Sequence, residues 1–290
     1  DGTLYVSEGS NAGGGGLDGF LAGQTDKLRA LGTEDGDERW SFETEAPGGV
    51  PTVAYETVYV QDRRGKVYAV ERSTGRLRWK SETERGIEVG APAVGDCTVY
   101  VGAAAGDESG AVYAFDASDG EELWRYAVDG TPTAPTFHDG TVYLGVNGTG
   151  RLHAVDGSEG ESVWVEETRG GGSIAPCSPA VDGERVYVGN YNGGHDAPAQ
   201  RLFGHDAEGG EELWSAEASG YVWSSPGVAG DRVVFADLDG YVRFVDTTDG
   251  EVVNTVRLSD DLIRSSPAVV DGTVYVGSED GSVYAVEGEF

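Results

Sequence analysis

One sequence phrase recurs along this 290-residue chain at nearly constant spacing. It consists of a strand-like triplet, a turn that ends in Gly, and a Trp four residues later. The Trp positions are Trp40, Trp79, Trp124, Trp164 and Trp214, and a sixth copy has Asn254 where Trp is expected. Five steps cover the 214 residues from Trp40 to Asn254, which is about 43 residues per step. A repeat of this length restricts the fold to an array of similar units, each packed on its neighbours.

A second phrase precedes the first in each unit. It reads Pro, apolar residues, a tight turn and then Val-Tyr-Val, as from Pro92 to Val101 and from Pro267 to Val276. Apolar and polar residues alternate between Gly, Asp and Asn turns, which predicts half-buried strands. Each unit is therefore expected to hold four short antiparallel strands, named A (after Pro), B (Val-Tyr-Val), C (Val-Tyr-Ala) and D (with Trp). Four strands in about 43 residues are typical of a propeller blade.

The phrases predict an all-β protein, a seven-bladed β-propeller of four-stranded antiparallel blades. Seven B strands are expected, beginning at Leu4, Val58, Val99, Val142, Val186, Val233 and Val274. Strand A of the first blade and strand D of the last are missing, so the sequence is expected to begin within a blade. An eighth blade would require about 60 further residues. Within one domain, 1–290, the expected blades are approximately 1–46, 47–86, 87–130, 131–170, 171–220, 221–260 and 261–290. The five Trp side chains are expected to be buried between neighbouring blades.

The pattern Ala114-x-Asp116, Gly120-x-x-x-Trp124, repeated from Ala154 to Trp164, resembles the tryptophan-docking repeat of pyrroloquinoline-quinone (PQQ)-type β-propellers. That family includes quinoprotein dehydrogenases and non-catalytic relatives such as the bacterial outer-membrane assembly lipoprotein B. The resemblance covers nearly the whole chain and implies the propeller fold. It does not by itself fix the function, because one fold serves many functions.

The cysteines bear on the choice between enzyme and non-enzyme. The quinoprotein enzymes of this family carry a vicinal cysteine pair and calcium-binding carboxylates, whereas Cys97 and Cys177 are 80 residues apart. The resemblance therefore implies no cofactor, with PQQ and calcium both disfavoured, and no catalytic residue is named. The blade register places the two cysteines at opposite ends of their strands, so both are expected to be free thiols.

Loop lengths distinguish the two sides of each expected blade. The offset from Pro to the first B-strand residue is 7 in all six cases, and the offset from the first residue of the strand C triplet, such as Val67, to Trp or Asn254 is 12. The B–C offsets instead run from 7 to 22 and the D–A offsets from 11 to 15. Because the strands alternate in direction, the constant turns share one side, here called the uniform face, and the others share the variable-loop face. Binding residues concentrate on elaborated loops, so the variable-loop face is the predicted binding face. Neutral loop drift is the alternative, since long insertions cost little.

The leading candidates on the variable-loop face are Trp223 and Arg264, each followed by Ser-Ser-Pro and aligned just before strand A. An aromatic ring beside a guanidinium suits a planar anion or an acidic peptide. Alternatively, Trp223 packs over the next blade and Arg264 neutralises nearby carboxylates. Weaker candidates are Tyr191, His195 and Asp196 in the insertion between Asn190 and Gln200, for which a flexible solvated loop is the alternative.

Other motifs predict little chemistry. The four His residues lack metal-ligand spacing, so no metal site is expected. The segment 237–240, Asp-Leu-Asp-Gly, is similar to the start of a calcium loop but lacks the downstream Glu, so a hairpin turn is expected. His153 replaces Tyr in a C strand and is expected to be packed. Asn147-Gly148-Thr149 is a glycosylation sequon and also a favoured hairpin turn.

The net charge is −31, from 20 Lys and Arg against 51 Asp and Glu. Such a surface repels nucleic acid and anionic lipid, and no run of 18 apolar residues predicts a membrane span. Abundant carboxylates with only three Lys resemble proteins of extreme halophiles, in which about 1 M salt screens the repulsion. An ordinary acidic secreted protein is the alternative.

Together these features favour a non-catalytic scaffold at the cell surface or outside the cell, bound to another protein or envelope component through the variable-loop face. A small quinoprotein-type dehydrogenase is one alternative. The sensor ectodomain of a longer membrane protein is another.

Overall fold

The computed structural model describes residues 2–8, 26–86, 90–106, 109–168, 173–174, 177–191 and 200–287. These residues form a seven-bladed β-propeller of antiparallel sheets, which confirms the predicted fold class. None of them forms a helix that could cross a membrane. The chain divides into two compact units, Asp1–Ala127 with blades 1 to 3 and Val128–Phe290 with blades 4 to 7.

The first unit contains three blades. Blade 1 has β1 (Thr3–Glu8), β2 (Lys27–Gly32) and β3 (Glu38–Glu43). Blade 2 has β4 (Thr52–Ala54), β5 (Thr57–Gln61), β6 (Lys66–Glu71) and β7 (Leu77–Glu82). Blade 3 has β8 (Arg85–Gly86), β9 (Ala93–Gly95), β10 (Thr98–Ala104), β11 (Gly110–Asp116) and β12 (Glu122–Val128).

The second unit contains four blades. Blade 4 has β13 (Thr131–Pro132), β14 (Thr136–His138), β15 (Thr141–Asn147), β16 (Arg151–Asp156) and β17 (Ser162–Glu167). Blade 5 has β18 (Ser173–Ile174), β19 (Ala180–Val181), β20 (Arg185–Tyr191), β21 (Arg201–Asp206) and β22 (Glu212–Glu217). Blade 6 has β23 (Gly227–Ala229), β24 (Arg232–Ala236), β25 (Tyr241–Asp246) and β26 (Val252–Arg257). Blade 7 has β27 (Ala268–Val270), β28 (Thr273–Gly277) and β29 (Val283–Glu287).

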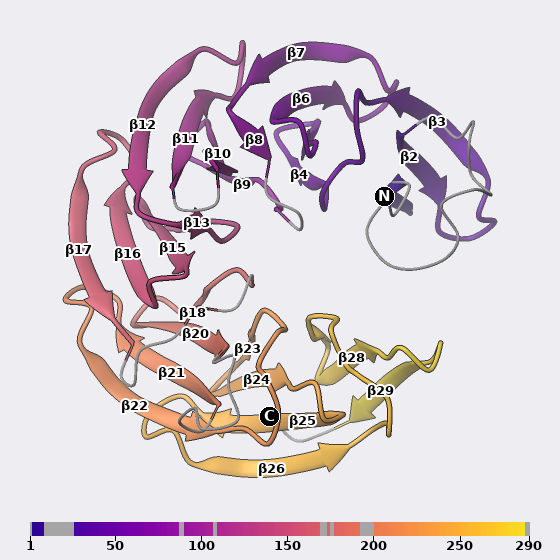
Figure 1. Ribbon diagram of the computed structural model, residues 1–290. Helices are drawn as coiled ribbons and strands as arrows, with labels where there is room; N and C mark the ends of the chain where they lie inside the picture. Colours follow the sequence, from indigo (N-terminus) through magenta and orange to yellow (C-terminus); the bar gives the residue numbers. More distant parts are fainter. Residues whose placement is uncertain are drawn as a thin grey trace. The chain divides into compact units, whose positions relative to one another are not determined.

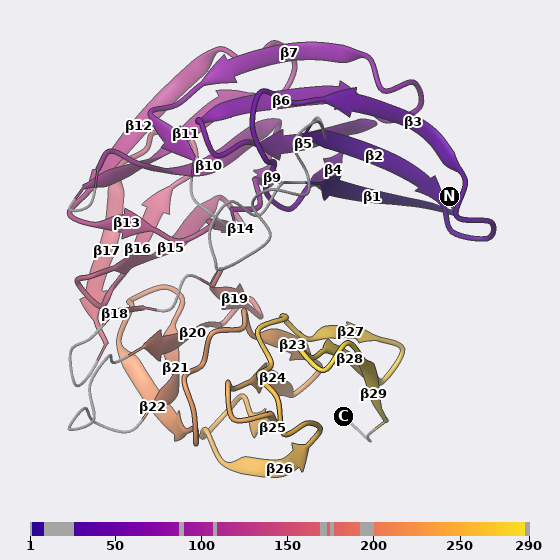
Figure 2. The same cartoon turned by 45° about the vertical axis from the view of Figure 1, so that its right-hand side comes forward.

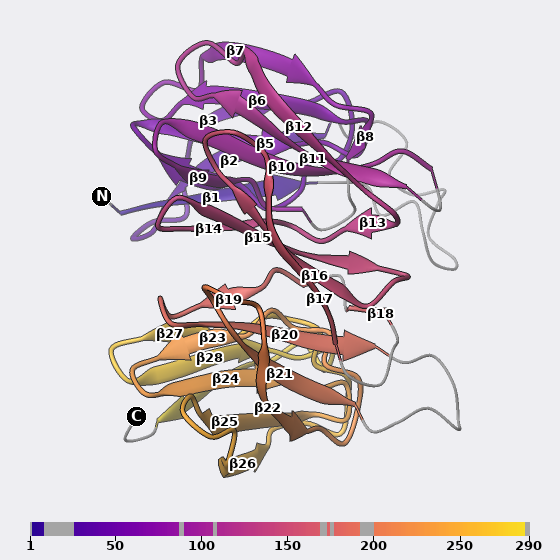
Figure 3. The ribbon, with the colours of Figure 1, turned by 90° about the vertical axis from the view of Figure 1, so that its left-hand side faces the viewer.

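Each sheet follows the predicted order from A to D. In blade 2 the strands pair as β4-β5-β6-β7. In blade 6 they pair as β23-β24-β25-β26, and Figure 3 shows these four strands next to one another. The D strands, such as β7 and β26, end their sheets and lie on the outer side of their blades (Figure 1). Blade 1 is described as strands B, C and D, β1-β2-β3 (Figure 2), and blade 7 as strands A, B and C.

Strand A differs from the expectation in blades 3, 4 and 5, where it consists of two short pieces. In blade 4, β13 pairs with the end of β15 at Val146–Asn147, and β14 pairs with its beginning. Residues 133–135 interrupt the ladder between the two pieces, and Pro135, which has no N–H to donate, lies in this interruption. The same division occurs between β8 and β9 and between β18 and β19.

The repeated Trp and Gly act together where one blade packs on the next. The indole N–H of Trp79 donates to the carbonyl of Ala117 in the following blade, 2.9 Å away. Gly120, in the same turn, has φ +79°, and a Cβ there would lie 2.6 Å from the Trp79 ring. A glycine is therefore required by the backbone and by the close approach of the ring. Equivalent indole bonds join Trp40 to Arg72, Trp164 to Ala207 and Trp214 to Thr247.

Trp burial varies along the array. Trp79 and Trp214 are buried, whereas Trp40, Trp124 and Trp164 are half-buried and keep part of the ring in solvent. The expectation of uniform burial is therefore too strong, because D is an edge strand and only one face of its side chain meets the next blade. Strands B and C supply the main core, including Val58, Val60, Val67 and Val70, each fully buried.

Candidate functional site

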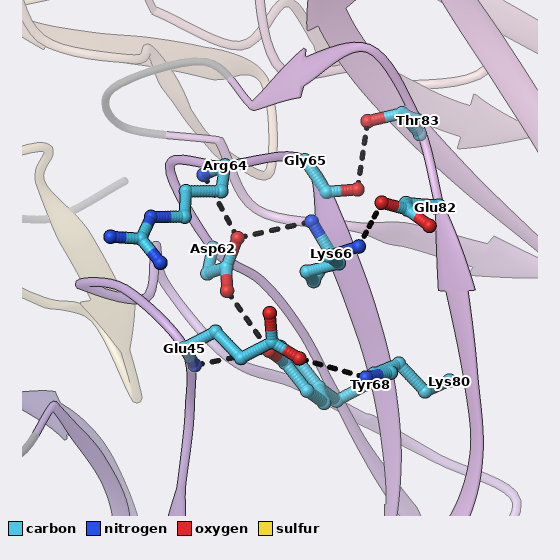
Figure 4. A network of polar contacts seen from close by, with 9 residues as sticks. All are labelled: Glu45, Asp62, Arg64, Gly65, Lys66, Tyr68, Lys80, Glu82 and Thr83. Atoms are coloured by element: carbon cyan, nitrogen blue, oxygen red, sulfur yellow. Dashed lines mark hydrogen bonds and ion pairs between the residues drawn. The ribbon is translucent and has the colours of Figure 1, made fainter.

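The B–C turn of blade 2 is built around one buried carboxylate. Asp62 follows β5 directly and is 1% exposed. Its Oδ1 accepts the backbone N–H groups of Arg64 at 2.9 Å and Lys66 at 3.0 Å, and its Oδ2 accepts the Tyr68 hydroxyl at 3.0 Å (Figure 4). The turn backbone and a C-strand side chain therefore fix this carboxylate fully inside the protein.

Ion pairs surround this turn. Lys80 Nζ lies 2.8 Å from Glu45 Oε1, and Lys66 pairs with Glu82 (Figure 4). The hydrogen bond from Lys80 lowers the pKa of Glu45 below its ordinary value. Burial, followed by the carboxylate of Asp62, raises the pKa of Tyr68, so this hydroxyl remains a donor at neutral pH.

Blade 6 repeats the arrangement with a different donor. Asp237, fully buried, accepts the N–H groups of Asp239 at 3.1 Å and Tyr241 at 3.2 Å. Its other oxygen forms an ion pair with the buried guanidinium of Arg243. Residues 237–240 thus form the expected hairpin turn. Among the described residues, no group of three or more His, Cys, Asp or Glu is arranged to hold a metal ion.

Trp223 and Arg264 lie together on the variable-loop face of blades 6 and 7. The Arg264 Cζ lies over the Trp223 ring, 5.7 Å from its centroid. Arg264 Nε is also 2.9 Å from Glu279 Oε1, with both side chains about half exposed. The site is therefore an indole covered by a guanidinium whose charge is balanced by one carboxylate. The sequence suggests two roles for Arg264, stacking on Trp223 to bind a ligand and neutralising a nearby carboxylate. The structure shows both contacts in this one cluster.

The loops that carry this pair are held in the same way in both blades. The Tyr221 carbonyl accepts the N–H of Leu238 at 3.0 Å, and the Leu262 carbonyl accepts that of Glu279 at 3.0 Å. Each bond ties a D–A loop to the following B–C turn. Trp223 and Arg264 therefore occupy equivalent positions, as the alignment on Pro indicates, and both project from anchored backbone.

The Ser-Ser-Pro segments supply further anchors that the sequence analysis missed. Ser224 Oγ accepts the N–H of Ala236 and donates to its carbonyl, at 3.0 and 2.9 Å. Ser265 does the same with Gly277, at 2.8 Å for both bonds. Ser225 N–H donates to Ser266 Oγ of the next blade at 3.0 Å. In the alignment on Pro, the residue two before Pro is small in all six copies and carries a hydroxyl at Thr133, Ser224 and Ser265, which is the sequence signal for these anchors.

Residues 6–107, 63–197 and 178–289 match the PQQ_2 family, described as outer membrane protein assembly factor BamB. The chain belongs to this family. The assembly factor BamB of Salmonella typhimurium is 25% identical over 334 residues, covering 92% of this chain and 81% of that protein. The crystal structure of BamB from Moraxella catarrhalis has a TM-score of 0.68 at 22% identity and covers 91% of this chain and 77% of that one. A europium-containing methanol dehydrogenase has a TM-score of 0.55 at 13% identity, covering 98% and 80%. These two likenesses show the fold alone.

The described residues of this BamB-family chain do not fit the PQQ arrangement named above. Cys97 is exposed in the A–B turn of blade 3, Cys177 is buried before β19 of blade 5, and both are free thiols. Burial raises the pKa of the Cys177 thiol to about 11, so it remains protonated at neutral pH. The two cysteines therefore supply no adjacent pair. That this chain uses no cofactor remains a prediction.

The remaining candidates are spread over other blades of the BamB-family propeller. Tyr191 ends β20, whose last pairing is with Ser173, and its side chain lies outside the described residues, as do His195 and Asp196. Asn147 ends β15 and is exposed, followed by Gly148 with φ +94°. The described site is therefore the Trp223–Arg264–Glu279 cluster.

Proposed function

We propose that this BamB-family propeller is a non-catalytic scaffold that binds another protein, or an envelope component, through its variable-loop face. The observation that carries the proposal is the stack of the half-buried Trp223 and the exposed Arg264 on two anchored loops. Trp and Arg are over-represented among the residues that dominate protein–protein binding energy. Loops already held by hydrogen bonds lose little conformational entropy on binding.

The named relatives support the class of partner. They are described as outer membrane protein assembly factors, which fits a role beside other proteins of a cell envelope. We propose that this chain likewise acts at the cell surface or in the envelope, with the Arg264 guanidinium offered to an acidic or carbonyl-rich segment of its partner. Because Glu279 already balances that charge, the partner must replace the Glu279 contact or extend it.

Affinity capture from an envelope extract of the producing organism tests this function. The unchanged protein and a Leu213→Ala control, altered at an exposed position next to the C–D turn of blade 5, should retain the same partner. Trp223→Ala/Arg264→Ala should lose it. Equal capture by all three proteins would remove Trp223 and Arg264 from the binding site.

The dehydrogenase alternative has its own test. The protein, loaded with PQQ and calcium, should show no dye-coupled dehydrogenase activity above that of a denatured sample with a range of alcohols and sugars. Saturable turnover would contradict the proposal of a non-catalytic scaffold.

A further inference from the structure

Blade 2 carries a charge opposite to that of the rest of the chain. Residues 47–86, the segment expected for blade 2, contain eight Lys and Arg against five Asp and Glu, a net charge of +3, whereas the whole chain carries −31. One of the eight, Arg85, lies in β8 of blade 3, so blade 2 itself has seven. Each of the other six blade segments is negative, from −4 to −8. Eight of the 20 cationic residues thus lie in one segment of 40 residues.

The cations of blade 2 include positions that are acidic in other blades. Arg76 directly follows the turn glycine of the C–D turn and is exposed. The equivalent residues of blades 1, 3, 4, 5 and 6 are all acidic: Asp37, Glu121, Glu161, Glu211 and Glu251. Arg78, two residues later, is also exposed, where blades 3 and 5 have Leu. The cationic side chains of blade 2 therefore interrupt a series of acidic turns.

Several of these cations have no carboxylate partner. Arg78 Nη1 donates to Thr57 Oγ1 at 2.8 Å, which fixes the guanidinium without neutralising it. Among the described residues, the exposed Arg64 and Arg76 side chains form no ion pair. Their positive charge is available to an incoming anion.

Together these residues form an extended strip. We define the blade 2 strip as Arg64, Lys66, Arg76, Arg78 and Lys80, arranged along the edge strand β7. Arg76 and Arg78 lie at the start of β7. At its end, Thr83 N–H donates to Gly65 O at 2.7 Å, which brings the turn with Arg64 and Lys66 next to the strand. The strip thus follows the six residues of β7, a length of about 20 Å.

We propose that the blade 2 strip binds an extended acidic segment of a partner protein, at a site separate from the Trp223–Arg264 cluster. A segment of about six extended residues matches the length of β7. Its carboxylates suit the bidentate geometry of Arg64, Arg76 and Arg78. A second copy of the chain would bring its own −31 charge, and a nucleic acid a dense row of phosphates. The carboxylates of the surrounding blades repel both of these large anionic partners. A short peptide segment instead interacts mainly with the cations of the blade 2 strip, because charges beyond a Debye length of about 8 Å are screened.

The test measures binding of a fluorescein-labelled peptide of about 12 residues with alternating Glu and Ser, a length that exceeds the strip. Fluorescence anisotropy in about 0.15 M salt should show saturable binding to the unchanged protein, and the matching Gln-Ser peptide should not bind. Arg76→Glu/Arg78→Leu installs the residues that blades 3 and 5 carry at these positions, so the blade retains its fold. This variant should weaken the binding at least about tenfold.

The control variant Arg39→Glu/Arg151→Ser lowers the net charge by the same amount through two exposed arginines of blades 1 and 4. It should retain the peptide affinity within about twofold, and so should Trp223→Ala/Arg264→Ala, whatever the fate of the proposed scaffold function. Equal losses in the strip variant and the control variant would overturn the proposal, because net charge alone would then explain binding. Absence of saturable binding, or tighter binding of an oligothymidine strand than of the peptide, would also overturn it.

Discussion

The buried Asp237–Arg243 pair gives a prediction for which the chain supplies its own control sequences. Arg243 is 8% exposed and Asp237 fully buried at their side chains. Replacing Arg243 with Phe removes the guanidinium from Asp237 Oδ2, whose remaining contacts are the N–H groups of Ser219 and Gly220 at 3.2 and 3.4 Å. Because a buried charge is left without its partner, we expect Arg243→Phe to lower the free energy of unfolding by about 3–5 kcal/mol.

Two further variants separate this effect from a simple change of packing. Arg243→Tyr reproduces the Asp62–Tyr68 pair of blade 2, in which the Tyr68 hydroxyl donates to Asp62 Oδ2 at 3.0 Å. This variant should lower the free energy of unfolding by less than about 1.5 kcal/mol. The double variant Asp237→Asn/Arg243→Phe reproduces Asn190 and Phe203 of blade 5. It should recover much of the loss from Arg243→Phe, because the uncompensated charge is gone.

Urea unfolding at one fixed KCl concentration measures these four proteins and the single variant Asp237→Asn. With that fifth protein, the double-mutant cycle gives the coupling between positions 237 and 243. If Arg243→Phe unfolds within about 1 kcal/mol of the unchanged protein, the pair contributes little. If Arg243→Tyr is as destabilising as Arg243→Phe, a hydroxyl donor does not replace the guanidinium, and the equivalence of the two blades is wrong.

Three other predictions follow from single features. Burial lowers the pKa of His153 to about 4. Between about pH 6.5 and 4, the unfolded chain therefore binds a proton at this residue that the folded chain does not bind. The free energy of unfolding consequently falls as the pH falls through this window. His153→Tyr, as in blade 2, should reduce that fall by about 2 kcal/mol in urea titrations at pH 7 and pH 4.5; unchanged pH dependence would contradict it. Gly120→Ala should lower the free energy of unfolding by at least about 1 kcal/mol more than Gly36→Ala does. Both glycines have φ above +70°, but of the two only Gly120 faces a Trp ring. Equal midpoints of urea unfolding for the two variants would refute Trp docking. The melting temperature should rise strongly from about 0.1 M to about 3 M KCl because of the −31 charge, and equal melting temperatures would refute the halophile interpretation.

The repeat predicts most of the fold because each blade is specified by the same few residues. Pro, Val-Tyr-Val and Gly-x-x-x-Trp mark strands A, B and D, and the observed strands follow them from β4 to β26. The alignment on Pro also places Trp223 and Arg264 at equivalent positions, which their stacking in the structure reflects. Residues at the same position of a repeat meet their neighbours in the same way.

The remaining features depend on contacts that vary between blades. The two-residue strands β8, β13 and β18 are too short to show a period of apolar residues. The buried carboxylate of Asp62 is satisfied by Tyr68 and that of Asp237 by Arg243, so the donor changes its residue type from one blade to the next. Trp burial also differs between blades, since Trp79 and Trp214 are buried and Trp40, Trp124 and Trp164 half-buried, although the offset within each repeat is constant.

Hydrogen–deuterium exchange of the protein with and without its captured partner tests the proposed binding face most directly. The scaffold proposal predicts slower exchange in the D–A loops and B–C turns around Trp223, Leu238 and Glu279 when the partner is bound. Exchange in the C–D turn of blade 6, 246–250, and in that of the neighbouring blade 5, 206–210, should stay unchanged. Protection of those C–D turns, with no change at Trp223 and Glu279, would place the partner on the uniform face and contradict the proposal.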